Sequence, residues 1–100
     1  MIRHIVLFKL KDFSSEVERN DALEKVLINF LSLKGEIPQI RYFNVERNIT
    51  DRPGAFDVII DSNFDSLEDL RSYQDHPAHQ YAVSQNKQWC SHKAFVDYKL

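Results

Sequence analysis

The sequence predicts an α+β fold with the element order β-α-β-β-α-(α)-β, the ferredoxin-like split βαβ arrangement. Residues 2–10 and 56–64 alternate with the period of strands, residues 15–35 carry apolar side chains at helical spacing, and turn residues separate the segments. A four-stranded antiparallel sheet with its helices on one face accommodates this order. At 100 residues, the chain has the length of a single domain, residues 1–100.

The first strand, residues 2–10, is apolar on both faces. Ile5 and Leu7 point to one face. The opposite face carries Ile2, His4, Val6, Phe8 and Leu10. Helices on one face leave the other uncovered, and an exposed apolar face needs a partner. A second copy of the sheet is the simplest cover, so we expect a twofold homodimer through the open sheet face.

The first helix is expected to begin after Ser15, because Ser15 and Glu18 have the spacing of a capping box. Gly35 is a natural stop for this helix. Its inward face is predicted to hold Leu23, Val26, Leu27, Phe30 and Leu31.

Two strands joined by a turn are expected next. In residues 40–49, Tyr42 and Asn44 are out of step with the apolar Phe43 and Val45. The turn is Asp51-Arg52-Pro53-Gly54. Residues 56–64 alternate cleanly, and their apolar face is formed by Phe56, Val58, Ile60 and Phe64.

The second helix is capped by Ser66 and should end near Asp75, since the residue before Pro77 is unfavourable in helical geometry. Pro77 suits the first turn of a third helix, and residues 93–99 close the chain as a strand. The inward side chains are predicted to be Leu67, Leu70 and Tyr73 in the second helix and Ala82, Val83 and Trp89 in the third.

Composition excludes several classes of function. The 13 Lys and Arg residues are balanced by 15 Asp and Glu, and a pI near 6.0 lacks the basic character of nucleic-acid-binding proteins. No apolar run reaches the ~20 residues of a membrane span. The lone Cys90 cannot form an intrachain disulfide or a Cys-rich zinc site. We expect a cytoplasmic protein with no metal, no cofactor, no nucleic acid and no membrane partner.

The densest group of chemically active side chains lies between Tyr73 and Gln80. Histidine exchanges protons near neutral pH, and tyrosine can polarise a carbonyl. Because Pro77 fixes the chain direction, His79 could face Tyr73, which makes this pair the candidate catalytic site. In the alternative interpretation, His76 caps the third helix and His79 only packs. His76 and His79, with Pro77 between them, do not have a recognised metal-ligand spacing.

His4 lies on the apolar face that looks toward the helices, so its imidazole needs an interior partner. A backbone carbonyl would make His4 structural, whereas Tyr73 or His79 would make it part of a pocket between sheet and helices. The candidate pocket-lining residues are His4, Val6, Phe8, Val58, Ile60 and His76. The strand carboxylates expected to be solvated or to face an interface are Asp57, Asp61 and Asp97.

Several stretches resemble one known family along essentially the whole chain. They are MIRHIVLFKLKD at residues 1–12, Ile37-Pro38, FDVIIDSNFDSLEDLRSY at residues 56–73, HPAHQ at residues 76–80, and Val96-Asp97-Tyr98. The sequence is identified as a member of the Dabb family, the stress-responsive dimeric α–β barrel proteins. The resemblance implies a homodimer whose two sheets close into a barrel, and most members have no assigned activity.

One member of this family is a plant polyketide cyclase whose working tyrosine and histidine fall on Tyr73 and His79. The resemblance implies that His79 is a general base and that Tyr73 orients a keto substrate, while the cyclase's strand histidine falls on His4. A further pocket histidine of the cyclase falls on Val58 here. The region of its helix aromatics holds Leu23, Val26 and Leu27, so the cyclase's substrate is not carried over.

Three functions are therefore considered. The first is a homodimeric barrel protein that is stress-related or binds a small hydrophobic or keto-containing ligand. The second is a small enzyme of the polyketide-cyclase type that acts through His79 and Tyr73. The third is a haem or quinone monooxygenase of the wider dimeric barrel superfamily, with His79 or His76 as a ligand.

Overall fold

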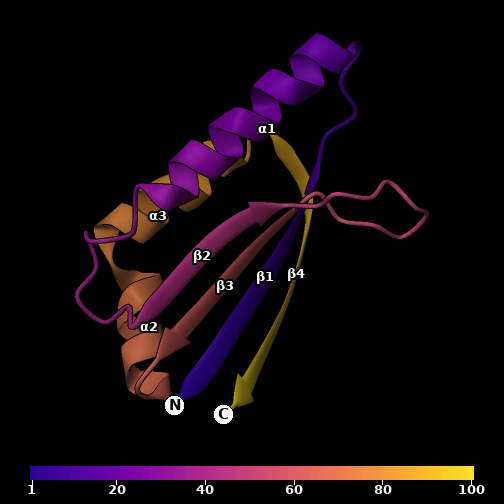
Figure 1. Ribbon diagram of the computed structural model, residues 1–100. Coiled ribbons are helices and arrows are strands. Elements are labelled where there is room, and N and C mark those ends of the chain that lie inside the picture. The colour runs from indigo at the N-terminus through magenta and orange to yellow at the C-terminus, as the bar shows by residue number, and fades with distance from the viewer.

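The computed structural model describes all 100 residues, which form one four-stranded antiparallel sheet and three helices (Figure 1). The strand order is β2-β3-β1-β4, and the helices lie on one face of the sheet. This is the predicted α+β ferredoxin-like fold. Its elements are β1 (Ile2–Leu10), α1 (Glu16–Leu31), β2 (Tyr42–Arg47), β3 (Val58–Phe64), α2 (Leu67–Asp75), α3 (Pro77–Asn86) and β4 (Cys90–Lys99).

β1 is an interior strand that pairs with β3 on one side and β4 on the other. Ile5 and Leu7 on its outer face remain partly exposed. The buried side chains on its helix-facing side are His4, Val6, Phe8 and Leu10. The prediction that this strand is apolar on both faces and faces the helices with His4 is confirmed.

α1 begins at a capped end, as predicted. The Ser15 hydroxyl accepts the Glu18 N–H at 3.2 Å, but the Glu18 carboxylate accepts the Ser14 hydroxyl at 2.8 Å, so only half of the capping box forms. The helix ends at Leu31, and Gly35 follows in a turn with φ of 88°, a conformation that favours glycine. Leu31 is 45% exposed rather than in the core, because it is turned about 100° from the buried Phe30.

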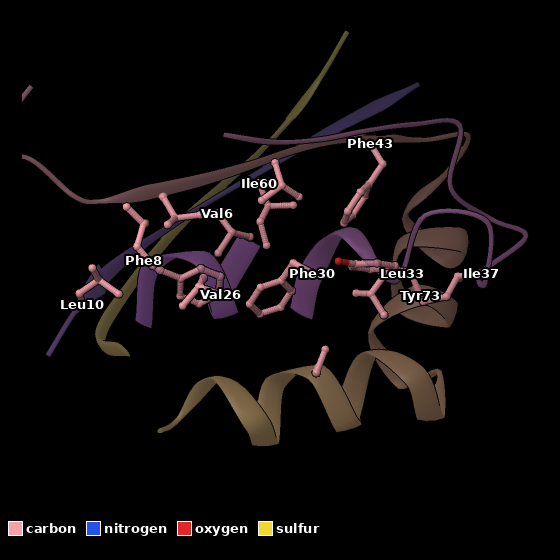
Figure 2. Packing of buried hydrophobic residues seen from close by; sticks show 14 of the residues in the cluster. Val6, Phe8, Leu10, Val26, Phe30, Leu33, Ile37, Phe43, Ile60 and Tyr73 are labelled. Carbon is pink, nitrogen blue, oxygen red and sulfur yellow. The ribbon is translucent and has the colours of Figure 1, made fainter. Parts of the chain in front are cut away.

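The core fills the space between the sheet and the helices (Figure 2). Phe8 of β1 stacks on Phe30 of α1 with ring centroids 5.0 Å apart, and Tyr73 of α2 lies beside Phe64 at 4.9 Å. Figure 2 shows Phe30 in the middle of this layer, between Val26 and Tyr73. Seventeen buried apolar residues form this single cluster, so the interior is occupied by side chains.

The two strands of the β2–β3 hairpin are shorter than predicted. Residues 48–57 leave the sheet and project as an arm (Figure 1). The Asn48 amide closes the base of the arm by donating from Nδ2 to the Phe56 carbonyl at 2.7 Å, and its backbone N–H donates to the Asp57 carbonyl at 2.8 Å. Phe56 therefore lies outside β3, and Ile49 in the arm is 94% exposed.

Two further boundaries differ from the prediction. α3 ends at Asn86, so Trp89 lies in a turn, where its carbonyl accepts the Lys11 N–H at 2.9 Å. This contact carries the sheet pairing beyond β1, and β4 consequently begins at Cys90. Leu67, predicted to point inward, is 52% exposed because it is the first residue of α2, at the rim of the helix layer.

β4 is the least covered strand. Phe95 on its helix-facing side and Val96 on its outer side are each 61% exposed. The apolar part of the uncovered sheet surface, called here the open face, consists of Ile5, Leu7, Ile59, Ala94 and Val96. None of the three helices is a candidate for a membrane-crossing segment.

Candidate functional site

The junction between α2 and α3 is built by one histidine. His76 is both the C-cap of α2 and the N-cap of α3, and its backbone is extended between the two helices. Its Nδ1 accepts the Ala78 N–H at 3.0 Å, and its own N–H donates to the Tyr73 carbonyl at 3.2 Å. Pro77 occupies the first turn of α3, where its missing N–H leaves no bond unmade. His76 thus holds the turn that orients α3.

His79 lies one turn into α3 and faces back to α2. Its Nδ1 is 3.1 Å from the Gln74 carbonyl oxygen. A carbonyl only accepts, so Nδ1 carries the proton of the neutral ring and Nε2 keeps its lone pair. The imidazole lies against the Tyr73 ring, with centroids 4.5 Å apart at 55°. The structure therefore brings together the two residues that the sequence singled out.

The electrostatics around His79 favour its neutral form. Burial lowers the pKa of the imidazole below its ordinary value, because the charged ring loses hydration. The positive charge of Lys93 lowers it further, as do His4 and His76. The hydrogen bond to the Gln74 carbonyl acts in the opposite direction and is outweighed. A neutral imidazole with a free Nε2 is the form that accepts a proton.

Tyr73 is a core residue rather than a surface acid. It is 1% exposed, and burial raises the pKa of its phenol far above the ordinary value of 10.0. Figure 2 shows its hydroxyl directed toward Phe30. Its ring also contacts those of Phe43 and His4, with centroids 6.3 Å away in both cases. Tyr73 therefore provides a fixed surface against which the His79 ring packs.

His4 finds its partner on β4. Its Nδ1 bonds to the Asp97 carboxylate, directly opposite in the antiparallel register of β1 and β4. The sequence interpretation considered a backbone carbonyl, Tyr73 or His79 as the partner and missed Asp97. No sequence signal pointed to Asp97, because the pairing depends on the register of β1 and β4, in which the two chain ends meet, as in the Leu100 N–H to Met1 carbonyl bond at 2.9 Å.

A cavity of about 290 Å³ opens beside His79, between α3 and β4. Its lining is formed by Gln74, His79, Gln80, Val83 and Lys93. Tyr73 does not line it, and of the other predicted lining residues, His4, Val6 and Ile60 are buried in the core. Phe8 lines a neighbouring cavity of about 170 Å³, whereas Val58 lines one on the opposite side of the sheet.

The two other carboxylates that the sequence singled out, Asp57 and Asp61, lie beside arginines. Asp57 accepts the Leu10 N–H at 2.8 Å and an Arg19 guanidinium N–H at 2.7 Å. Asp61 lies 3.4 Å from Arg3 on the outer side of the sheet. Asp57 was expected to be solvated or to face an interface, and instead it bridges β1 and α1. For Asp61, which lies on the uncovered side of the sheet, an interface position stays a prediction.

The other candidate chemistries find little support in the geometry. Burial raises the pKa of the Cys90 thiol to about 11, so the thiol is protonated at neutral pH. No three side chains of His, Cys, Asp or Glu are grouped so that they could hold a metal ion.

Comparison with known proteins gives a consistent result. The family model described as the stress responsive A/B barrel domain, Dabb, matches residues 2–100. An uncharacterised protein of Streptomyces coelicolor is 42% identical over 87 residues, which cover 84% of each chain. A dimeric ferredoxin-like protein of unknown function from Bacteroides fragilis has a TM-score of 0.84 at 31% identity, covering 99% of this chain and 95% of that one. A dimeric ferredoxin-like protein of unknown function from Thermobifida fusca has a TM-score of 0.83 at 26% identity, covering 99% and 90%.

Proposed function

The chain belongs to the stress-responsive A/B barrel (Dabb) family, and we propose that it is a homodimer that binds a small ketone-containing compound beside His79. The observation that carries the proposal is the state of His79. The imidazole is neutral, its Nδ1 is occupied by the Gln74 carbonyl, and it lines a cavity of about 290 Å³. A stress-related setting is proposed from the family's description alone.

The cavity supports a small ligand by its size and its lining. Its volume of about 290 Å³ is just below the ~300–1,000 Å³ typical of ligand pockets, which suits a small ligand. Val83 supplies an apolar wall, while Gln74, Gln80 and Lys93 supply polar groups. Four of the five lining residues are polar, so the cavity offers a ligand mainly hydrogen-bonding groups beside one apolar contact.

The open face supports self-association. Leu7 pairs with Ile59 and Ala94 across three strands, and Val96 is 61% exposed at the edge of the same face. Covering such a surface with a second copy removes apolar area from water. The dimeric relatives from Bacteroides fragilis and Thermobifida fusca support this assembly for the present chain.

A second candidate function, proton transfer, is favoured by the free Nε2 of His79. Nε2 would remove a proton from the carbon beside the ligand's carbonyl, and the C–H electron pair would pass to the carbonyl oxygen as an enolate. The enolate carbon could then bond to a second carbonyl of the same molecule, and the proton on Nε2 would return to the new alkoxide. We propose Tyr73 as the positioning residue of this base, because its ring holds the imidazole at 4.5 Å.

Binding is tested with heptan-2-one as a probe. It is followed by the NMR signals of the probe in every protein and by those of the histidine rings in the wild type. The expected result is a saturable shift of the His79 ring protons in the wild type and no binding in His79→Gln. Tyr81→Gln is the control, because Tyr81 is 65% exposed on α3 and lines neither this cavity nor the neighbouring one. Equal binding by wild type and His79→Gln would overturn the proposed site.

Proton transfer is tested in deuterated water by deuterium uptake at the carbons flanking the heptan-2-one carbonyl. Wild type should accelerate uptake, and His79→Gln should return it to the background rate. Tyr73→Phe should retain uptake, because the ring and not the hydroxyl contacts His79. Loss of uptake in Tyr73→Phe with binding retained would instead assign the hydroxyl a direct contact with the substrate.

A further inference from the structure

The cavity beside His79 lies next to a second one on the same side of the sheet. The neighbouring cavity of about 170 Å³ shares Val83 and Lys93 with the first. Phe8 contributes apolar surface to its lining, and Lys87 at the end of α3 contributes a second amine. These two adjacent cavities between α3 and β4 are together called here the α3–β4 groove.

The charge of the α3–β4 groove is opposite to that of the chain. Neither cavity has an Asp or Glu in its lining, although the chain carries 15 such residues and a net charge of −2. Lys87 and Lys93 both line it, and neither takes part in an ion pair within the chain. The groove therefore holds uncompensated positive charge beside apolar surface.

Lys93 is located where this charge can act on a ligand at His79. It stands on the helix-facing side of β4, opposite Phe8 in the strand register. Its Nζ is 6.0 Å from the Phe95 ring centroid, and it lines both cavities. The charge of Lys93 is felt by His79, since it contributes to lowering the pKa of that imidazole.

We infer that the α3–β4 groove takes an oxo carboxylate, with the carboxylate on the Lys93 amine, the ketone at His79 and a short carbon chain along Val83. The inference rests on the proposed function and narrows its ligand to an anion. An amine without a carboxylate partner gains a charge-assisted hydrogen bond from such a ligand. The same positive charge also stabilises an enolate that forms beside His79.

The test compares 5-oxohexanoate with 5-oxohexanamide, which have the same carbon chain and differ in charge. Dissociation constants are measured by calorimetry on the full chain. We expect the wild type to bind the carboxylate more tightly than the amide, and Lys93→Gln to weaken carboxylate binding by about tenfold, which corresponds to about 1.4 kcal/mol. Binding of the amide should not change, and Lys93→Arg should retain carboxylate binding.

Lys99→Gln is the matched control, because Lys99 is exposed on the same side of the same strand but lines neither cavity. A second readout is the pKa of His79 by NMR, which should rise in Lys93→Gln and stay unchanged in Lys99→Gln. The inference is overturned if wild type binds acid and amide equally, if it binds neither, or if Lys93→Gln and Lys99→Gln behave alike. The proposed function fails separately, when heptan-2-one does not bind at His79.

Discussion

Removal of the Asp97 carboxylate should destabilise the fold, because it leaves a buried imidazole without its partner. The His4 side chain is 5% exposed, and its Nδ1 bonds to Asp97, whose side chain is 28% exposed. A buried donor left unsatisfied costs roughly 1–3 kcal/mol. We therefore expect Asp97→Ala to lower the free energy of unfolding by about 2 kcal/mol. For a domain of this length, that corresponds to a fall in the melting temperature of ~8–16 °C.

The assay is urea unfolding followed by circular dichroism, at equal protein concentrations because a dimer's stability depends on concentration. Asp97→Asn retains an acceptor oxygen and should lose less than half as much. In a His4→Leu background there is no imidazole to satisfy, so Asp97→Ala should then change stability by less than about 0.5 kcal/mol. An effect of Asp97→Ala that is equally large with and without His4 would refute the reasoning.

Two further predictions concern pH and assembly. Because the folded pKa of His79 lies below its ordinary value of 6.5, the unfolded chain binds the proton first as the pH falls. The part of the free energy of unfolding that His79 contributes above pH 6.5 is therefore lost progressively as the pH falls to the folded pKa. Urea unfolding at about pH 7.5 and 5.5 should show a smaller loss of stability in His79→Gln than in wild type. Equal losses in the two proteins would contradict this prediction. Leu7→Glu places a charge on the open face and should raise the dissociation constant of the dimer by about tenfold or more in sedimentation experiments. Val17→Glu, at a site 80% exposed on α1, should leave it unchanged. A Leu7→Glu chain that dimerises as tightly as wild type would argue against this interface.

Features that depend on a local repeat were predictable from the sequence. The alternation around His4 correctly assigned it to the buried side of β1, and Pro77 correctly located the break between α2 and α3. The two-faced apolar pattern identified the open face for the same reason: a strand's side chains alternate whatever it packs against. Predicted inward positions failed at helix ends, as for Leu31 and Leu67, because spacing does not show where the neighbouring layer stops.

The candidate site was predictable only in part. The spacing across Pro77 predicted that His79 could face Tyr73, and the rings do meet. The middle of the space between the sheet and the helices is filled by core side chains, and the cavity beside His79 lies at its edge, between α3 and β4. The position of a cavity depends on side-chain volumes and on how much of the sheet each helix covers. A periodic pattern of apolar residues predicts neither.

The sequence by itself determined the order of the elements, the buried faces of β1 and β3, and the residue types available for chemistry. Only the tertiary structure decided the partners that come from distant parts of the chain. Asp97 reaches His4 and Lys93 reaches the cavity at His79 because β4 pairs with β1 in one particular register. That register depends on the sum of many weak contacts between the two ends of the chain, and a shift by one residue would turn both side chains to the opposite face.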